Sequence, residues 1–590
     1  MKSLHKASRT EVHGKAVVAG ARKLTTDTAI IILEKGGNAV DAGVAAAFVA
    51  AVIEPMETTL AGSGFMLVGE SDGKVHSVEF APRAPKKAHE NMFTIDKGQS
   101  VDRGLGISTV INDANVQGAL AAGVPATLRG LIDGHSKFGK LPLKDIMYPA
   151  ICAAYDGFEV DNYYVFEALD NLQALKQNDY ASRLFLVDGM PPKPVHLGRA
   201  TLSQPHVIKQ KALAQTLETI AEKGVDYFYG GPLGEQFIET HKALGGIVSI
   251  NDLRAVKTVI ATPRVLDFRG AQIWMPTAPS GAITQLEILN IWQHLYPESV
   301  SKDYSVDDVF NFAQVCWHAF ADRYYWLGDP DFVPVPEQGL LADDYAKHIA
   351  AKILNSKRLP FSVNTEETPW NYFASNAENN PLMFDEQFES ADVGWNPAGS
   401  TDCAKGTTHI SVTDEDGMMV SITHTAANHF GSKVVCEHTG LLLDAAMGWF
   451  NAVPNAANSI AGGKRPLANM GPALITKNNA PFAALGAPGG RRIICAVAQI
   501  ILNLIEKDMS ALEAVTAPRV DASGWDLLLS ERLVSMVDGF DARGIRTKLV
   551  NEQHEGFGYE FARPVVAVRA PSGAEASIDP FSKGFARGIN

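Results

Sequence analysis

The sequence predicts an α+β fold built as one large domain, and three observations support this class. Apolar residues alternate as in strands near both ends of the chain, whereas a long central stretch, from about Pro125 to Ala351, shows mostly helical spacing. No linker-like stretch separates these regions, and the sequence has no internal repeat. Hydrophobic residues make up 46% and charged residues 20% of the 590 residues, the balance of a globular protein with a large core.

The N-terminal region opens with two predicted helices, in "TTDTAIIILEKGGNAVDAGVAAAFVAAVIEP". Gly36 and Gly37 separate the helices, and Asn38 or Asp41 caps the second one. The alanine-rich second helix is too short to span a bilayer, so we expect it to be buried. A β-hairpin follows in "SGFMLVGESDGKVHSVEF", with its turn at residues 71–73.

The second half of the chain changes character twice. Residues 356–405 are acidic, rich in Asn and almost aperiodic, which predicts a long mobile loop or tail. From Thr407 onward the pattern returns to strands, interrupted by the helical segment "RRIICAVAQIILNLIEKD". A long loop directly before a strand raises the question of what the junction between them does.

Charge and cysteine content exclude several classes of protein. The formal net charge of −14 argues against a nucleic-acid or anionic-membrane partner, because both require a basic face. The 5 cysteines have neither the density of a disulfide scaffold nor the spacing of a zinc site. We therefore expect no metal and no cofactor. The N-terminus lacks the apolar run of a secretory signal, so the expected location is cytoplasmic, without a membrane partner.

The hairpin "GTTHISVTDEDGMMVSITHT" carries the first candidate for catalysis. Matching the apolar faces of its two strands puts Ile410 opposite Ile422 and Thr407 opposite Thr425. A threonine hydroxyl is a weak nucleophile, and an N-terminal threonine can use its own α-amine as the base. Cleavage after Gly406 would create that N-terminus, and glycine tolerates the strained backbone that such a cut requires. On the hairpin alone, a simple Thr-rich edge strand remains the alternative.

A second element strengthens the catalytic interpretation. Gly489 and Gly490 lie between the apolar strand "PFAAL" and a helix, in "LGAPGGRRIICAVAQ". Two amides at such a turn can stabilise a developing oxyanion. A phosphate-binding loop is the rival interpretation, but neither the dinucleotide pattern nor the Lys-Ser/Thr pattern is present, and we expect no nucleotide.

In combination, the motifs resemble the γ-glutamyltranspeptidase (glutathione hydrolase) family of N-terminal-nucleophile hydrolases. They are, in order, "LEKGGNAVDAGVAAAF", "GSGFMLV", "GVPATLRG", "YPAICAAYDGFEV", "FADRYYWLGDPDFVPVP", "GTTHISVTDEDG", "GGKRPLANMGPALI" and "GAPGGRR". The resemblance implies a four-layer αββα sandwich, made as a precursor that cuts itself. Residues 1–406 would become the large subunit and residues 407–590 the small one, both within one domain.

The resemblance also assigns the reaction centre. Thr407 matches the nucleophile, Thr425 the threonine that contacts it, and Gly489 and Gly490 the oxyanion glycines. The implied partners are a small-molecule amide or γ-glutamyl substrate and the two subunits of one precursor, with homo-oligomerisation of the processed heterodimer left open.

The expected substrate pocket departs from the family pattern. Where the family places polar contacts to a γ-glutamyl head group, the positions matched here are Val78, Ala427 with the adjacent Asn428, Ala446, Trp449, Ala468 and Asn469. Arg491, after the oxyanion glycines, is a candidate anchor for a substrate carboxylate; a structural role is its alternative.

Three functions follow from this pattern. The first is a γ-glutamyl hydrolase or transferase that uses substitute contacts. The second is an amidase or acylase for a less polar or a carboxylated acyl group, because apolar walls cannot pair a charged head group. The third, from a different class, is a non-catalytic binding relative.

Overall fold

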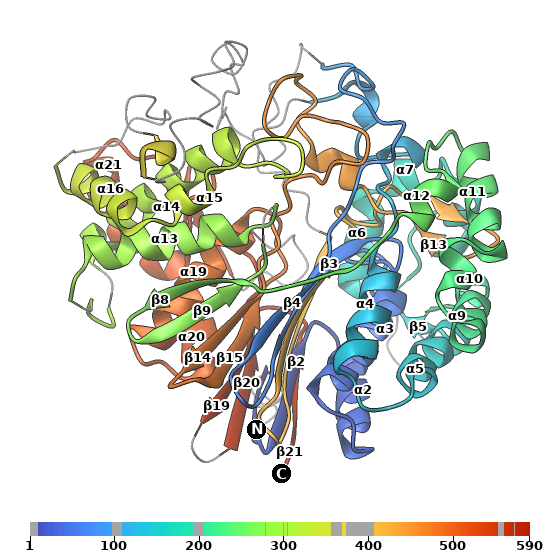
Figure 1. The fold of residues 1–590 in the computed structure, drawn as a ribbon, viewed down its shortest axis with the longest axis horizontal. Coiled ribbons are helices and arrows are strands. Elements are labelled where there is room, and N and C mark those ends of the chain that lie inside the picture. The colour runs from blue at the N-terminus through green and yellow to red at the C-terminus, as the bar shows by residue number, and fades with distance from the viewer. Residues whose placement is uncertain are drawn as a thin grey trace.

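Two seven-stranded sheets lie face to face at the centre of the molecule, and helices cover the outer face of each sheet (Figure 1). The chain therefore forms a four-layer αββα sandwich, as predicted. The computed structural model describes residues 10–96, 109–193, 206–355, 368–372, 406–552, 560–570 and 573–590, apart from Ala278, Ser299, Tyr304 and Trp525. Among the described residues, no helix is both long and apolar enough to cross a membrane.

The first sheet is antiparallel throughout and contains the hairpin predicted around Thr407. Its strands, in spatial order, are β21 (Phe585–Ile589), β2 (Ala16–Gly20), β10 (Thr407–Thr413), β11 (Met419–Thr425), β3 (Ser63–Gly69), β4 (Val75–Phe80) and β7 (Val259–Ala261). The β10–β11 hairpin thus occupies the middle of the sheet. It is not an edge strand, and every residue in both of its strands is buried.

The second sheet is also antiparallel. Its strands, in order, are β1 (Glu11–Gly14), β20 (Gly573–Ile578), β19 (Val565–Ala570), β15 (Ala480–Gly486), β14 (Ala473–Lys477), β9 (Ala271–Met275) and β8 (Arg264–Phe268). Between the sheets, Val17 and Ala19 of β2 pack with Val565 and Ala567 of β19 in one apolar cluster.

The helices of the first sheet's outer layer bury its apolar face. They include α2 (Lys23–Glu34), α3 (Ala39–Ile53), α4 (Thr127–Phe138), α5 (Leu143–Asp156) and α9 (Lys211–Lys223). All of α3 is buried, as its alanine-rich sequence predicted. Its N-terminus is a capping box: the Asn38 side chain accepts from the Asp41 N–H, and the Asp41 carboxylate accepts from the Asn38 N–H. Both predicted capping residues therefore act together.

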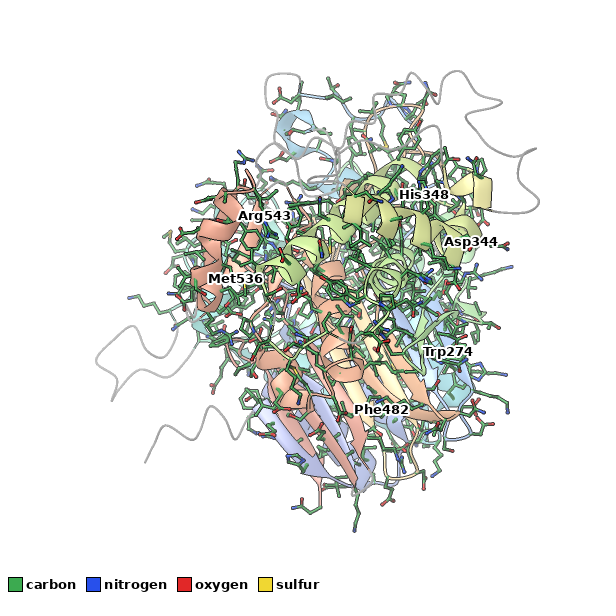
Figure 2. The ribbon with its side chains drawn as sticks, turned by 90° about the vertical axis from the view of Figure 1, so that its left-hand side faces the viewer. Trp274, Asp344, His348, Phe482, Met536 and Arg543 are labelled. Atoms are coloured by element: carbon green, nitrogen blue, oxygen red, sulfur yellow. The ribbon has the colours of Figure 1, made fainter. Side chains whose placement is uncertain are left out.

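A second helix layer covers the other sheet. It comprises α13 (Ala282–Leu295), α14 (Val306–Trp326), α16 (Asp343–Asn355), α19 (Arg492–Ile505) and α20 (Ala511–Thr516). Figure 2 is turned towards this layer and labels Asp344 and His348 on α16, and Trp274 and Phe482 on strands β9 and β15. One apolar cluster joins these helices to the sheet.

Shorter elements complete the described chain. The helices are α6 (Asn162–Asp170), α7 (Leu172–Leu175), α8 (Asp179–Phe185), α10 (Asp226–Tyr229), α11 (Pro232–Ala243), α12 (Ile250–Arg254), α15 (Glu337–Leu340) and α21 (Val537–Asp541). The strands are β5 (Phe158–Glu159), β6 (Val207–Ile208), β12 (Val435–Cys436), β13 (Leu441–Leu442), β16 (Val520–Asp521), β17 (Leu527–Ser530) and β18 (Thr547–Val550). The 3₁₀ turns are η1 (Ile111–Asp113), η2 (Ala119–Ala121), η3 (Pro369–Tyr372), η4 (Ala446–Trp449) and η5 (Glu531–Met536).

The central stretch is mostly helical, as expected, but it also supplies short strands. The stretch expected to be mostly helical up to Ala351 also contains β7, β8 and β9, and β8 and β9 complete one side of the second sheet. These strands are only three to five residues long, and β9 pairs with β14 about 200 residues later in the chain. A short strand with a distant partner leaves little local signal. The predicted loop at 356–405 lies outside the described residues except for 368–372.

Candidate active site

Thr407 begins the central strand β10, directly opposite the last residue of β11. The register pairs Thr407 with Thr425 and Ile410 with Ile422, which confirms the pairing predicted from the apolar faces. The two threonine hydroxyl oxygens lie 3.1 Å apart, within hydrogen-bond distance. Ile410 and Ile422 belong to the helix-facing core, so strand alternation turns both threonines towards the second sheet.

Thr425 also contacts the peptide bond expected to be cut. Its hydroxyl donates a hydrogen bond to the carbonyl oxygen of Gly406. The Thr425 hydroxyl oxygen in turn accepts a hydrogen bond from the N–H of Ala427 at 2.8 Å. A hydroxyl has one proton to donate and two acceptor sites, so the remaining site suits a bond donated by Thr407 Oγ1. The carbonyl next to Thr407 is therefore polarised by a donor that the sheet register fixes.

Gly406 is held where no other residue fits. A Cβ added there would lie 2.3 Å from the carbonyl oxygen of Asn428, a contact with backbone that cannot move aside easily. Glycine at this position is thus required by close packing of the segment that precedes the nucleophile.

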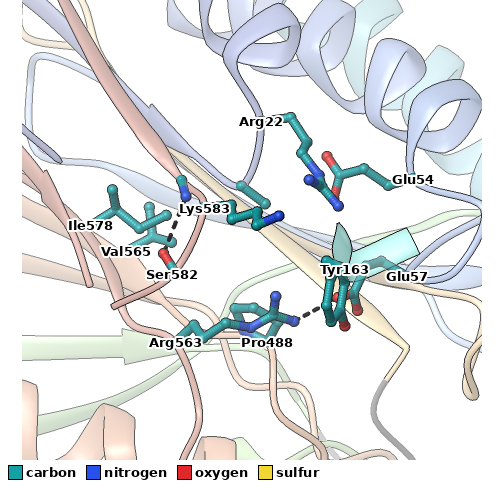
Figure 3. Close-up of a pocket in the computed structure, with 12 residues that line it drawn as sticks. Arg22, Glu54, Glu57, Tyr163, Pro488, Arg563, Val565, Ile578, Ser582 and Lys583 are labelled. Atoms are coloured by element: carbon teal, nitrogen blue, oxygen red, sulfur yellow. Dashed lines mark hydrogen bonds and ion pairs between the residues drawn. The ribbon is translucent and has the colours of Figure 1, made fainter. Parts of the chain in front are cut away.

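A carboxylate that the sequence did not point to holds the backbone nitrogen of Thr407. Glu57, in the turn after α3, accepts that N–H through Oε2 at 2.8 Å. Its other oxygen accepts from the Tyr163 hydroxyl at 2.5 Å and from Arg563 Nη2 at 2.7 Å (Figure 3). Burial opposes ionisation of Glu57, but Arg563, His429 and Tyr163 outweigh it and lower the pKa of the carboxyl below its usual value. Glu57 therefore places a carboxylate at the backbone nitrogen of Thr407, the atom expected to become an α-amine.

Glu57 also borders a small pocket on the amine side of Thr407. Its lining includes Arg22, Glu54, Arg563 and Lys583 (Figure 3). Glu54 is fully buried, and burial raises its pKa to about 7, although the neighbouring charge of Arg22 acts in the opposite direction. The only early signal for these two glutamates was their position in the apolar run "AVIEPMETTLAG".

The predicted glycine pair lies between β15 and α19, as expected. Gly489 has φ +142° and Gly490 has φ +61°, both in the region that favours glycine. A Cβ on Gly489 would also lie 2.6 Å from Cα of Ala562. The turn can therefore present two backbone amides without side chains in the way, which is the arrangement an oxyanion site requires.

Three predicted pocket residues come together in an apolar cluster beside Thr425. The cluster contains Phe65, Ala121, Ala427, Ala445, Trp449, Ala468 and Met470, with Ala81 packed against it. Ala427 lies two residues after Thr425 and donates its N–H to the Thr425 hydroxyl oxygen. The cluster therefore forms an apolar wall that starts at the reaction centre.

The remaining predicted pocket residues have other surroundings. Ala446 is buried in η4, and a Cβ on Gly123 would lie 3.1 Å from its methyl carbon. Asn428 accepts the N–H of His429 at 2.9 Å, within its own loop. Asn469 accepts a hydrogen bond from Arg323 at 3.1 Å.

The structure does not bring Val78 to the cluster that contains the other apolar pocket candidates. Val78 is fully buried in the core between β4 and the helices, and a Cβ on Gly134 of α4 would lie 3.2 Å from it. Side chains alternate along a strand, so Val78 points away from the face that carries Thr407. Ala81, just after β4, is the residue from this segment that reaches the apolar cluster.

Arg491 is the residue just before α19 and is 7% exposed. Its guanidinium packs near the 522–524 segment, where a Cβ on Gly524 would lie 3.0 Å from Nη2. Arg465 forms ion pairs with Asp329, at 2.5 Å, and Asp331, at 3.1 Å. It thereby holds two loops together.

The sandwich with a threonine at the start of a central strand defines the class of N-terminal-nucleophile hydrolases, and comparison with known proteins identifies the family. The family model described as Gamma-glutamyltranspeptidase matches residues 25–588. The glutathione hydrolase proenzyme of Escherichia coli (strain K12) is 33% identical, covering 86% of this chain and 80% of that protein. The Acylase ACY 1 proenzyme of Pseudomonas sp. (strain V22) is 32% identical, covering 90% and 85%. The chain belongs to the γ-glutamyltranspeptidase family.

Solved structures agree on the fold. The crystal structure of cephalosporin acylase from Bacillus halodurans superposes with a TM-score of 0.79, covering 99% of this chain and 97% of that one. At 24% identity, this likeness supports the αββα architecture alone.

Proposed function

We propose that the chain is a self-processing amidohydrolase in which Thr407 is the nucleophile, and that its substrates carry an acyl group without an α-amino acid head. Two relatives named in the comparison, a glutathione hydrolase and an acylase, support amide chemistry. The observation that carries the proposal is the arrangement of Thr407 between Thr425 and Glu57, beside an apolar wall.

Self-processing starts with attack of Thr407 Oγ1 on the carbonyl carbon of Gly406. Thr425 donates to the carbonyl oxygen as it gains negative charge. The C–N bond then breaks, the nitrogen gains the proton that the hydroxyl lost, and an ester joins Gly406 to Thr407. Water hydrolyses the ester, which yields a Gly406 carboxylate, the free hydroxyl and a new α-amine. The products are subunits 1–406 and 407–590.

The new amine is the general base for turnover. It takes the proton of Thr407 Oγ1 while the hydroxyl oxygen attacks a substrate amide, and it then protonates the leaving amine. Glu57 accepts a hydrogen bond from this nitrogen and keeps it oriented. The amides of Gly489 and Gly490 stabilise the oxyanion. Water, or an acceptor amine, resolves the acyl-enzyme.

The apolar wall supports the acylase assignment. The ammonium and carboxylate of a γ-glutamyl head group would lose their hydration against Ala427, Trp449 and Ala468 and gain no polar partner. This loss would weaken binding by roughly several kcal/mol. A γ-glutamyl enzyme is the second candidate, because a relative is named glutathione hydrolase and Asn428 and Asn469 supply polar groups near the wall. The third alternative, a non-catalytic binding protein, would not require the contacts of Thr407 with Thr425 and Glu57.

Rates on a matched pair of anilides test the substrate assignment. We expect kcat/KM for a simple acyl anilide, such as a glutaryl or butyryl anilide, to exceed that for the γ-glutamyl anilide by at least tenfold. The Thr407→Ala variant is the control, because it removes hydrolysis of both. Equal or better hydrolysis of the γ-glutamyl compound would contradict the apolar-pocket proposal and leave the nucleophile assignment intact.

A further inference from the structure

A second group of ionisable side chains lies in the helix layer over the second sheet, outside the catalytic site. Glu287 on α13 and His318 and Asp322 on α14 offer three ligand atoms that all lie within 4.8 Å of one another. His318 Nε2 is 3.1 Å from Asp322 Oδ2. The Tyr345 hydroxyl of α16 lies 3.1 Å from the same imidazole nitrogen and 2.5 Å from Asp322 Oδ2. Side chains from three helices therefore meet at one polar centre. The helices themselves, α13, α14 and α16, are labelled in the same layer in Figure 1.

The two carboxylates of this centre have different surroundings. Asp322, 2% exposed, is contacted by His318 and by the Tyr345 hydroxyl. Glu287, beside it, is fully buried, and neither of its carboxylate oxygens accepts a hydrogen bond from any residue that the structure describes. A buried pair of carboxylates needs a positive partner.

The adjacent arginine is engaged elsewhere. Arg323, next to Asp322 in the chain, donates to the carbonyl oxygens of Ser280, at 2.9 Å, and Ala468, at 2.7 Å. Its guanidinium therefore points into the loops behind the apolar wall. The two carboxylates can be balanced by protons, on His318 beside Asp322 and between the carboxylates, or by a bound cation that His318 and both carboxylates share.

We propose that Glu287, His318 and Asp322 bind one divalent transition-metal ion. Their three ligand atoms lie close enough together to bind one ion, and a charge of +2 balances the two buried carboxylates. One imidazole and two carboxylates suit Zn²⁺ or Mn²⁺ better than Ca²⁺ or Mg²⁺, which prefer oxygen ligands alone. The Tyr345 hydroxyl is placed to orient Asp322 by hydrogen bonding.

The site is structural. His318 and Asp322 are four residues apart and so share one face of α14, while Glu287 comes from α13. The ion therefore ties the two helices together next to Arg323, whose hydrogen bond to Ala468 holds part of the apolar wall. The metal takes no part in attack by Thr407.

Metal analysis of the purified protein, after incubation with Zn²⁺ or Mn²⁺ and removal of free ion, tests the proposal. We expect about one ion per chain, a rise in melting temperature on metal addition, and a Mn²⁺ electron paramagnetic resonance signal coupled to one imidazole nitrogen. Glu287→Gln and His318→Gln should each lower bound metal at least tenfold. Asp343→Asn is the matched control, because Asp343 forms an exposed pair with His294, at 3.4 Å, on the same helices α16 and α13.

Folding of each variant is checked by whether it is cut into the same two chains as the native protein, as seen on a denaturing gel. If the Glu287 variant fails to fold, the proposal is tested on the native protein alone. Bound metal is first removed with a chelator, and the binding of added Mn²⁺ is then measured by titration. Native protein that binds no more metal than the His318 variant, or whose melting temperature does not respond to either ion, would overturn the proposal and assign a shared proton to the pair.

Discussion

At the scale of single residues, the central contact is the one between Glu57 and the nitrogen of Thr407. In the uncut chain this nitrogen is an amide that donates to a carboxylate at 2.8 Å. After cleavage the same atom becomes an amine that must be neutral to act as a base. An ionised Glu57 favours the protonated amine, whereas Arg563, bonded to the other oxygen of Glu57, opposes it. The balance between these two charges sets the pH at which the base is free.

Replacing Glu57 with glutamine tests this role. The variant Glu57→Gln keeps the shape and an acceptor oxygen but removes the negative charge, and Arg563 then remains as the nearby positive charge. The pKa of the amine should fall, and the acid limb of the kcat/KM profile should move about 1–3 pH units lower. Glu54→Gln, in the same pocket but without a hydrogen bond to Thr407, is the comparison variant. An acid limb at the same pH in Glu57→Gln and in the native enzyme would show that Glu57 does not face the base.

Specificity also depends on individual residues of the apolar wall. Ala81 and Trp449 belong to the same apolar cluster, so the double variant Ala81→Arg with Trp449→Asp places an ion-pairing group at each of two positions in it. The ratio of γ-glutamyl to simple acyl hydrolysis should rise at least tenfold. Val78→Arg is the contrasting change, because it buries a charge in the helix-facing core and should lower the melting temperature without changing the ratio. The ratio would stay constant in the double variant if the acyl group bound elsewhere.

At the scale of elements, the strand-to-helix turn after β15 carries a prediction about rate. Gly489→Ala adds a methyl group 2.6 Å from Cα of Ala562 at a backbone with φ +142°. The turn must move, so kcat should fall about 10²–10³-fold, with a much smaller change in KM. Gly544→Ala is the matched control, since Gly544 also has positive φ, +69°, but a Cβ there has open space. A processed Gly489→Ala variant with native kcat would place the oxyanion site elsewhere.

The element scale also shows what local sequence can and cannot predict. Local patterns correctly predicted the hairpin register, the buried α3 and the turn between β15 and α19. Each of these depends on signals within a short segment: the spacing of apolar residues, the residues that cap a helix and the glycines of a turn. Glu57 could not be found in this way. Its contact with Thr407 spans 350 positions in the chain, and only the completed sandwich brings the two together.

The same limit applies to Val78. Motif matching gives the position of a residue in the chain, but not the face of the sheet that its side chain occupies. In the structure, the side chain of Val78 packs against α4 on the outer face of the first sheet, whereas Ala81 packs against the apolar cluster.

At the scale of the whole molecule, the fold surrounds the proposed cleavage site. The first sheet places β10, which would begin the small subunit, between β11 of the same subunit and β2, which would belong to the large one. Glu57 and Tyr163, on the large-subunit side of the proposed cut, meet Arg563 and Thr407 on the small-subunit side. The two products of cleavage would therefore stay together through shared sheets and a buried ion pair, and separation would require unfolding.

The most direct test of self-processing combines N-terminal sequencing with intact mass measurement of the purified protein. We predict two chains that remain associated, one ending at Gly406 and one starting with Thr407, and a single uncut chain for Thr407→Ala. An active native protein that stays in one piece, or that is cut at any other bond, would contradict the account of Thr407 as an N-terminal nucleophile.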